Sequence, residues 1–322
     1  MTKIDIFSGF LGAGKTTLIK KMIQEAYAGQ KLVLIENEFG EIGIDGGFLQ
    51  DAGINITEMN SGCICCSLVG DFGKALTQVI QEYAPERIVI EPSGVGKLSD
   101  VVAAVQKVTN EEVTLGYTVA VADAGKVKVY MKNFGEFYNN QIETASTIIL
   151  SRTDAIPQAK LDAAVAMLRE HNADATIVVA PWSELSGAQL LEAMEGKATL
   201  AAALEELEHE HHHDHEEGCC CSHHDHDHHH HADEVFTSWG VETTRKFTVA
   251  ELEAALHSLD TGRFVVILRA KGIVACADGG WIHFDYVPEE HNIRMGSASI
   301  IGKLCVIGAQ LDEQGVAKLF GV

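Results

Sequence analysis

The sequence lacks any uninterrupted run of about 18 uncharged apolar residues, which is what a membrane-spanning helix requires. It also lacks a basic and then apolar leader, because strand-like residues begin at Ile4. We therefore expect a cytoplasmic protein with no membrane partner. Basic residues are scarce as well, since 24 Lys and Arg stand against 46 Asp and Glu, for a net charge of -22. Neutralising phosphates needs clustered basic side chains, so this balance excludes a nucleic-acid partner.

Cysteine is present, but not in a pattern that suits disulfides. Six of the eight cysteines fall into two tight groups, which are Cys63, Cys65 and Cys66, and then residues 219–221. Adjacent thiols in a chain without an export signal favour metal or redox chemistry over cross-links. Cys276 and Cys305 stand alone in apolar runs, which predicts small buried side chains.

Short apolar runs alternate with helix-like stretches through the first part of the chain. The runs, each typical of a strand buried on both faces, are 4–7, 32–35, 88–90, 118–121, 148–150 and 177–179. The helix-like stretches are 16–27, 74–83, 158–171 and 187–194. Such alternation predicts an α/β fold with a mainly parallel sheet and helices on both faces.

The length of 322 residues favours two domains, and the composition indicates where they separate. Residues 205–234 hold eleven Asp and Glu and no Lys or Arg, and they have almost no apolar side chains, which predicts a disordered linker. We expect residues 1–200 to form the α/β domain and 240–322 a smaller α+β domain. Its predicted elements are a helix at 249–259 and strands at 264–270, 273–277, 281–286 and 304–308.

The segment from Gly9 to Thr16, GFLGAGKT, fits the phosphate-loop pattern G-x-x-x-x-G-K-[ST]. It lies between a predicted strand and a predicted helix, which is the context that supports such a match. Glycines let consecutive backbone N–H groups surround phosphates, and Lys and Thr of the pattern serve the β/γ-phosphates and Mg²⁺. We expect a P-loop NTPase whose loop binds nucleotide through Gly9, Gly12, Ala13, Gly14, Lys15, Thr16 and Thr17.

Two further strand ends complete the predicted nucleotide site. Glu91 ends the run 88–90 and is expected to hold the Mg²⁺ shell, and Gly94 can approach the γ-phosphate. Lys15, Thr16 and Glu91 are therefore the candidate catalytic residues. After the run 148–150 comes Ser-Arg-Thr-Asp, where Asp154 can accept hydrogen bonds from guanine and Arg152 can lie over the base. This element favours GTP and is similar to N-K-x-D, with Ser151 in place of the amide.

Two unusual strings lie between the phosphate loop and Glu91. They are 36–41, ENEFGE, and 62–66, GCICC. A turn can fold Cys63, Cys65 and Cys66 around one soft cation, with Glu36 or Glu41 completing the shell. Zn²⁺ is the first expectation and Co²⁺ the second. A redox-active thiol pair and an incidental cluster are the alternative interpretations.

Taken together, these motifs resemble the CobW-type GTPases, which are related to the nickel-enzyme maturation factors HypB and UreG. GFLGAGKTT, ENEFGEIGID, GCICC, EPSG and the Asp-terminated base element stand in that family's order, and 268–272 with Trp281 is similar to its C-terminal domain. The resemblance covers the whole chain. It implies a slow GTPase that delivers a transition metal to a client metalloprotein or cofactor-synthesis enzyme. It also implies that Cys63, Cys65 and Cys66 bind the metal.

Twelve of the sixteen histidines lie between His209 and His231, among acids and residues 219–221. Imidazoles bind Zn²⁺, Ni²⁺ and Co²⁺, so the tract is expected to collect metal, with a passive solvated spacer as the alternative.

The preferred hypothesis is that GTP and Mg²⁺ close the segments 36–45 and 63–66 over a captured ion, and that hydrolysis to GDP releases it. Two other functions remain open, namely a non-catalytic metal store and an ATP-using P-loop kinase. A homodimer is one assembly that the sequence allows.

Overall fold

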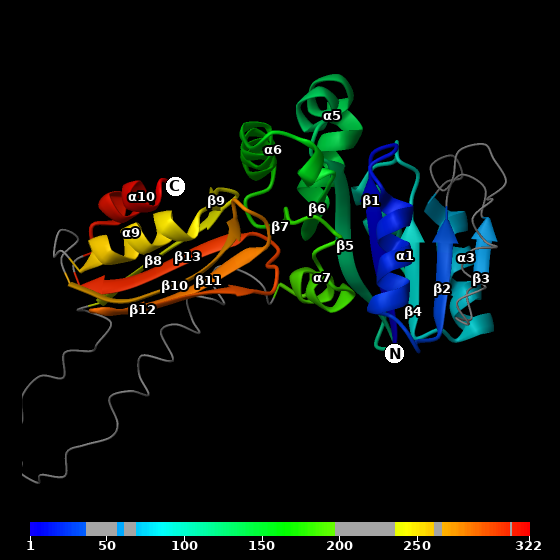
Figure 1. Ribbon diagram of the computed structural model, residues 1–322. Helices are drawn as coiled ribbons and strands as arrows, with labels where there is room; N and C mark the ends of the chain where they lie inside the picture. The colour runs from blue at the N-terminus through cyan, green and yellow to red at the C-terminus, as the bar shows by residue number, and fades with distance from the viewer. Residues whose placement is uncertain (37–56, 61–68, 197–235, 261–265, 310) are drawn as a thin grey trace, which may run out of the picture. The chain divides into compact units, whose positions relative to one another are not determined.

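The computed structural model describes residues 1–36, 57–60, 69–196, 236–260, 266–309 and 311–322. They belong to two compact units, Met1–Gly196 and Lys197–Val322 (Figure 1). The predicted linker at 205–234 lies outside the described residues. None of the helices described is long and apolar enough to cross a membrane.

The first unit is built on a parallel sheet. Its seven described strands lie in the order β3-β2-β4-β1-β5-β6-β7, and every neighbouring pair is parallel. This confirms the predicted α/β fold, in which both faces of the sheet are covered by helices. The strands are β1 Thr2–Gly9, β2 Leu32–Glu36, β3 Thr57–Asn60, β4 Arg87–Glu91, β5 Val113–Asp123, β6 Thr147–Ser151 and β7 Thr176–Val178.

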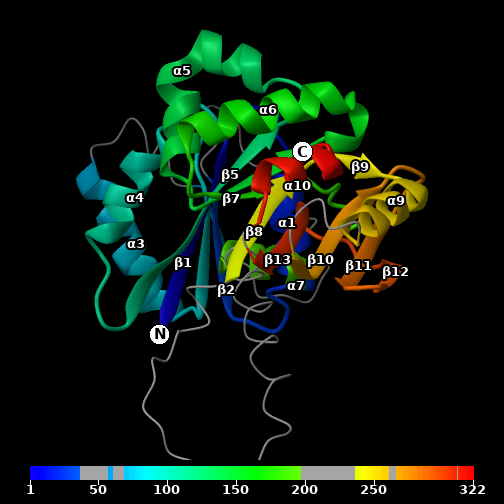
Figure 2. The same ribbon diagram turned by 90° about the vertical axis from the view of Figure 1, so that its left-hand side faces the viewer.

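Helices connect these strands and cover the sheet. Figure 2 shows α1 and α7 on one face and α3 and α4 on the other. The helices are α1 Lys15–Glu25, α3 Val69–Tyr83, α4 Leu98–Gln106, α5 Val127–Thr144, α6 Gln158–His171 and α7 Gly187–Met194, with a short 3-10 turn, η1, at Thr153–Ala155.

Two predicted helix boundaries were wrong. Helix α3 begins at Val69, before the predicted start at 74. Helix α1 ends at Glu25 rather than at 27, because the backbone N–H groups of Ala26 and Tyr27 both donate to the Met22 carbonyl and close the last turn. Tyr27 lies after the end of α1 but is still buried, and its hydroxyl contacts Asp5 of β1.

That contact belongs to a buried polar network in the amino-terminal half of the strands. Asp5 of β1 is fully buried, and its carboxylate accepts hydrogen bonds from the Tyr27 hydroxyl at 3.0 Å and the Tyr117 backbone N–H at 3.0 Å. The Arg87 guanidinium forms an ion pair with the same carboxylate and lies 4.2 Å from the Tyr27 ring centroid. Burial, followed by the Asp5 charge, raises the pKa of Tyr27 well above its usual range. The network fixes the half of the sheet opposite the phosphate loop.

At the carboxyl ends of the strands, the register aligns residues that are distant in sequence. Gly9 is opposite Val121, and Glu36 is opposite Glu91. Because all carboxyl ends of a parallel sheet meet at one edge, the loops that follow these strands share that edge. Ligands of such sheets bind there.

The second unit is an antiparallel sheet with two helices on one face. The sheet runs β12-β11-β10-β13-β8, and β9 pairs in parallel with β10. Helices α9 Val249–Leu259 and α10 Glu313–Phe320 lie over it (Figure 1). The strands are β8 Phe236–Thr243, β9 Lys246–Phe247, β10 Val266–Cys276, β11 Trp281–Val287, β12 Glu290–Gly296 and β13 Gly302–Ala309.

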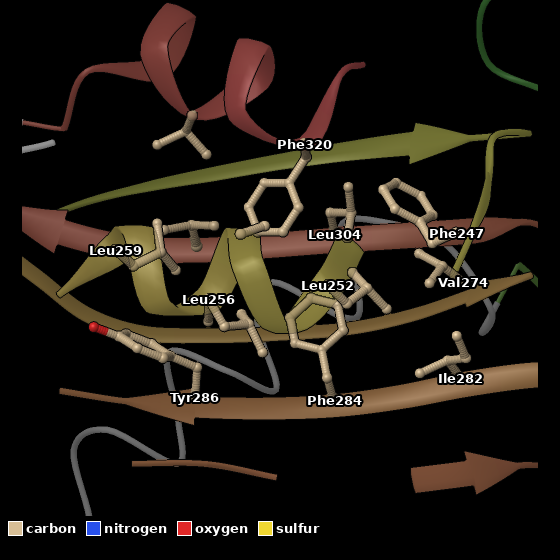
Figure 3. Close-up of a cluster of buried hydrophobic side chains, with 14 of the residues drawn as sticks. Phe247, Leu252, Leu256, Leu259, Val274, Ile282, Phe284, Tyr286, Leu304 and Phe320 are labelled. Carbon is tan, nitrogen blue, oxygen red and sulfur yellow. The ribbon is translucent and has the colours of Figure 1, made fainter. Parts of the chain in front are cut away.

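The predicted pair of strands at 264–270 and 273–277 is instead one strand, β10. Gly272 lies in its middle, where a Cβ would come within 2.3 Å of the Phe284 ring. The glycine therefore makes room for a core aromatic side chain rather than ending the strand. Figure 3 shows Phe284, Leu256 and Phe320 in that core, between the sheet and the two helices.

Cys276 and Cys305 are buried free cysteines, as predicted. Burial raises the pKa of the Cys305 thiol to about 11, which leaves it protonated and unreactive at neutral pH.

Candidate functional site

The phosphate-loop segment connects the end of β1 to the start of α1. Its three glycines, Gly9, Gly12 and Gly14, have φ values of 148°, 68° and 102°, which residues other than glycine rarely adopt. Gly14 is the N-cap of α1 and offers no side chain to the first turn, which also contains no acidic residue. The first turn of α1 therefore presents its N–H groups and the positive end of the helix dipole to the loop, an arrangement typical of anion sites.

Lys15, Thr16 and Glu91 are in contact. The Thr16 hydroxyl lies 3.2 Å from each carboxylate oxygen of Glu91, and the Lys15 ammonium lies 3.9 Å from Glu91 Oε1. Lys15 is buried, with 8% of its surface exposed. A hydroxyl beside a carboxylate is a pair of hard oxygen ligands, so these two groups fit Mg²⁺. Thr17, the next residue of α1, is exposed.

Gly94 lies directly against the phosphate loop. A Cβ on Gly94 would come within 2.9 Å of the Leu11 backbone nitrogen. Gln141 of α5 holds this segment from the other side, since its amide donates to the carbonyl oxygens of Gly94 at 3.1 Å and Gly96 at 2.8 Å. The loop after β4 is therefore held by α5 and lies against the phosphate loop.

The predicted base element follows β6 and also contacts the phosphate loop. Arg152, with φ of 56°, donates through Nη2 to the Gly12 carbonyl oxygen at 2.9 Å. Its Nη1 pairs with Asp123 Oδ2 at 2.6 Å. Asp154 lies in η1 and is exposed, whereas Ser151 is buried at the end of β6. The site therefore leaves the Asp154 carboxylate open to solvent.

Two residues of this site were not predicted. Asp123 ends β5, is 5% exposed, and accepts from the Gly125 N–H at 2.9 Å as well as pairing with Arg152. An acid ending an apolar run was the available signal, the same one that identified Glu91. Trp182 follows β7, donates from its indole nitrogen to the Leu150 carbonyl at 2.9 Å, and lies against Gly14. No pattern in the neighbouring sequence predicts that Trp182 lies at this site.

The predicted metal ligands are described only in part. Glu36 ends β2, where its register partners are Glu91 on β4 and Asn60 on β3. Glu41, Cys63, Cys65 and Cys66 lie outside the described residues, as does the histidine-rich tract. Within the part of the chain that the structure describes, no group of three or more His, Cys, Asp or Glu is placed to hold a metal ion.

Each of the two units matches a known protein family. Residues 3–179 match the CobW/HypB/UreG nucleotide-binding domain, and residues 236–321 match the cobalamin synthesis protein cobW C-terminal domain. The chain is 32% identical over 187 residues to the zinc chaperone CobW of Sinorhizobium sp, covering 49% of this chain and 52% of that protein. It is 30% identical over 155 residues to the zinc chaperone YeiR of Escherichia coli, covering 48% and 47%.

The chain thus spans about half the length of the curated relatives it matches. Among solved structures, the Zn(II)-bound YjiA GTPase from Escherichia coli is 20% identical, with a TM-score of 0.45 over 99% of this chain and 98% of that one.

Proposed function

The chain belongs to the CobW/HypB/UreG family, and we propose that it is a GTPase that couples its nucleotide state to the binding and delivery of a transition-metal ion. One observation carries the proposal. Glu36, at the start of the predicted metal-binding segment, is the register partner of Glu91, and Glu91 contacts Thr16 of the phosphate loop. Nucleotide and metal would therefore bind at adjacent strand ends.

In the nucleotide site, Lys15, Thr16 and Glu91 are already in contact with one another. The first turn of α1 and Lys15 bind the phosphates, and Thr16 and Glu91 hold Mg²⁺, which stabilises the charge that develops on the transferred phosphoryl group. Arg152 and Asp154 bind guanine. Asp154 can accept from two guanine N–H groups that adenine does not have, and its exposed position supports this role.

The predicted metal ligands Cys63, Cys65 and Cys66 follow β3 closely in the sequence. Cys63 follows Asn60, the end of β3, by three residues in the sequence, and a chain of three residues spans at most about 11 Å. Asn60 is itself paired with Glu36. Thiolates with one carboxylate suit Zn²⁺, which the names of the relatives mention, and Co²⁺ is the next candidate. The ion is cargo, to be passed to a client protein.

Coupling is expected because the two sites lie at the ends of neighbouring strands. A bound γ-phosphate orders the loops that contact it, and its hydrolysis releases them. Glu36 and Glu91 lie on neighbouring strands, so a shift of the segment after either strand changes the surroundings of both sites. We propose that the triphosphate form holds the ion tightly and that the diphosphate form releases it.

The decisive experiment measures Zn²⁺ affinity of the full chain by competition with a chromophoric chelator. It is run with a non-hydrolysable GTP analogue, with GDP and without nucleotide. We expect about a 5- to 150-fold difference between the first two states, the usual range for coupled sites. Equal affinities in all three states would refute the coupling, because a ligand shifts only states that it binds differently.

Two variants separate the sites. Lys15→Ala should abolish GTP turnover and the nucleotide effect while leaving Zn²⁺ binding in place. The triple replacement of Cys63, Cys65 and Cys66 by Ser should abolish the nucleotide-sensitive fraction of Zn²⁺ binding, while GTP still binds. Turnover that persists in Lys15→Ala would exclude the assigned phosphate loop.

A further inference from the structure

Trp182 lies beside the proposed nucleotide site but has none of the roles assigned above. Strand β7 ends at Val178, which is the register partner of Ile149, so β6 continues past the last strand pairing on that side. The next carbonyl, that of Leu150, accepts a hydrogen bond from the Trp182 indole nitrogen at 2.9 Å. The carbonyl after it, that of Ser151, pairs toward β5 with the Ala124 N–H at 3.1 Å. The indole thus provides the partner that a longer β7 would have supplied.

The same side chain reaches the phosphate loop. A Cβ on Gly14 would lie 3.1 Å and 3.5 Å from two carbons of the six-membered ring of Trp182. Gly14 is the N-cap of α1, with φ of 102°. The ring therefore lies against the turn where the phosphate loop becomes a helix, while its nitrogen is fixed to the end of β6.

Trp182 is only partly buried, unlike the core residue Trp281, which is 4% exposed. Packing of the hydrophobic core therefore does not account for its position. Its two contacts instead join the end of β6, directly before the predicted base element, to Gly14. Arg152 makes a parallel link from the same element to Gly12. Two side chains from one edge of the sheet thus hold two glycines of the phosphate loop.

We propose that Trp182 is a positioning residue that fixes the phosphate loop relative to the base-binding end of β6, so that base and phosphates bind as one preorganised unit. The inference rests on the proposed nucleotide site and adds a residue to it. A ligand that occupies both halves of the site gains from this fixed spacing, because the loops are already ordered before binding. A ligand that occupies only the phosphate loop gains much less.

The test compares GDP with inorganic tripolyphosphate, which has no base. Affinities of the full chain are measured with Mg²⁺ present, by competition against a fluorescent guanine nucleotide. In Trp182→Ala we expect GDP affinity to fall about tenfold, the scale of one lost buried hydrogen bond. Tripolyphosphate affinity should change by less than about threefold, because that ligand does not need the spacing. Equal losses for both ligands, or no loss for either, would overturn the inference.

Trp182→Phe keeps an aromatic ring beside Gly14 and removes the indole N–H, so it serves if the alanine variant does not fold. Its loss of GDP affinity should lie between those of wild type and Trp182→Ala. The guanine-nucleotide-induced change in tryptophan fluorescence should be present in wild type and absent in Trp182→Phe. Absence of GDP binding by wild type would instead contradict the proposed function.

Discussion

Replacing Gly9 with alanine should separate β1 from β5, whereas the same replacement at Gly12 should leave the sheet intact. A Cβ on Gly9 would lie 2.3 Å from the Val121 carbonyl oxygen and 3.1 Å from its carbon. Both are backbone atoms of the paired strand, so no side chain can rotate away. At Gly12 no atom lies within 4 Å of the added carbon, and only the backbone conformation resists.

The two costs can be separated. Both glycines have positive φ, which costs a side-chain-bearing residue about 1 to 2 kcal/mol. The overlap at Gly9 adds about 1 to 3 kcal/mol, the usual cost of forcing extra atoms into packed structure. Gly9→Ala should therefore lose roughly 2 to 5 kcal/mol of unfolding free energy, a large part of the roughly 5 to 15 kcal/mol that a domain has. Gly12→Ala should lose only the smaller first amount.

Urea unfolding of the full chain, combined with hydrogen exchange of peptides from β1 and β5, assigns the effect to the first unit. With a slope of about 1 to 3 kcal/mol per molar urea, the two variants should differ in midpoint by about 1 M. Gly12→Ala should still lose nucleotide affinity, since its Cβ projects from a loop expected to surround phosphates. Identical midpoints and identical exchange of β1 in the two variants would refute the reasoning.

Asp5→Ala leaves the buried guanidinium of Arg87 without its carboxylate and should cost about 3 to 5 kcal/mol in urea unfolding; a loss below about 1 kcal/mol would contradict the ion pair. Arg152→Ala should weaken GDP binding several-fold in calorimetry, with Arg152→Lys between it and wild type. The Asp260 carboxyl accepts from the Tyr286 hydroxyl at 2.7 Å, and this bond is the main cause that lowers its pKa. Its stabilisation should be present above its unfolded pKa of about 3.9 and be lost as pH falls through the lower folded value. Thermal unfolding of the second unit should therefore depend less on pH below about 4 in Asp260→Asn than in wild type.

Elements with strong local signals were predicted well. The predicted ranges of α6, α7 and α9 agree with the observed ones, because sequence marks both their apolar faces and their starts. Ser186 and Thr248 each form a capping box with the residue three positions later, and Pro157 precedes α6. The buried strands of the parallel sheet were recognised from their continuous apolar runs.

Elements without such signals were missed. Helix α5 carries exposed Val129 and Phe134 and is kinked at Phe134, so its apolar residues do not follow one face. Its ring contacts explain the pattern, because Phe134 and Tyr130 pack on Phe10 of the phosphate loop, with ring centroids 4.9 Å and 4.6 Å away. Strand β12 is mostly exposed and has few apolar residues to reveal it.

The residues of the candidate site also differ in how readily the sequence indicates them. The phosphate-loop segment and Glu91 are short contiguous patterns in a recognisable context, and the structure brings them into contact, while their roles with nucleotide stay predictions. The family resemblance is confirmed by matches over both units. Asp123 and Trp182 could not be predicted, because each acquires its role from partners elsewhere in the chain. Asp123 depends on Arg152, and Trp182 depends on Gly14, which is more than a hundred residues earlier.

The central position of β1 has a consequence for biosynthesis. Its neighbours in the sheet are β4 and β5, which are synthesised much later. Ile4 cannot pair before Ile88 has been made, and Gly9 cannot pair before Val121 has been made. At about 5 to 20 residues per second, a ribosome needs roughly 5 to 20 s to make that much chain. During this interval an apolar strand leaves the exit tunnel with no partner to pair with. We expect nascent chains of this protein to recruit chaperones early in translation, and their phosphate loop to form only after β5 has emerged.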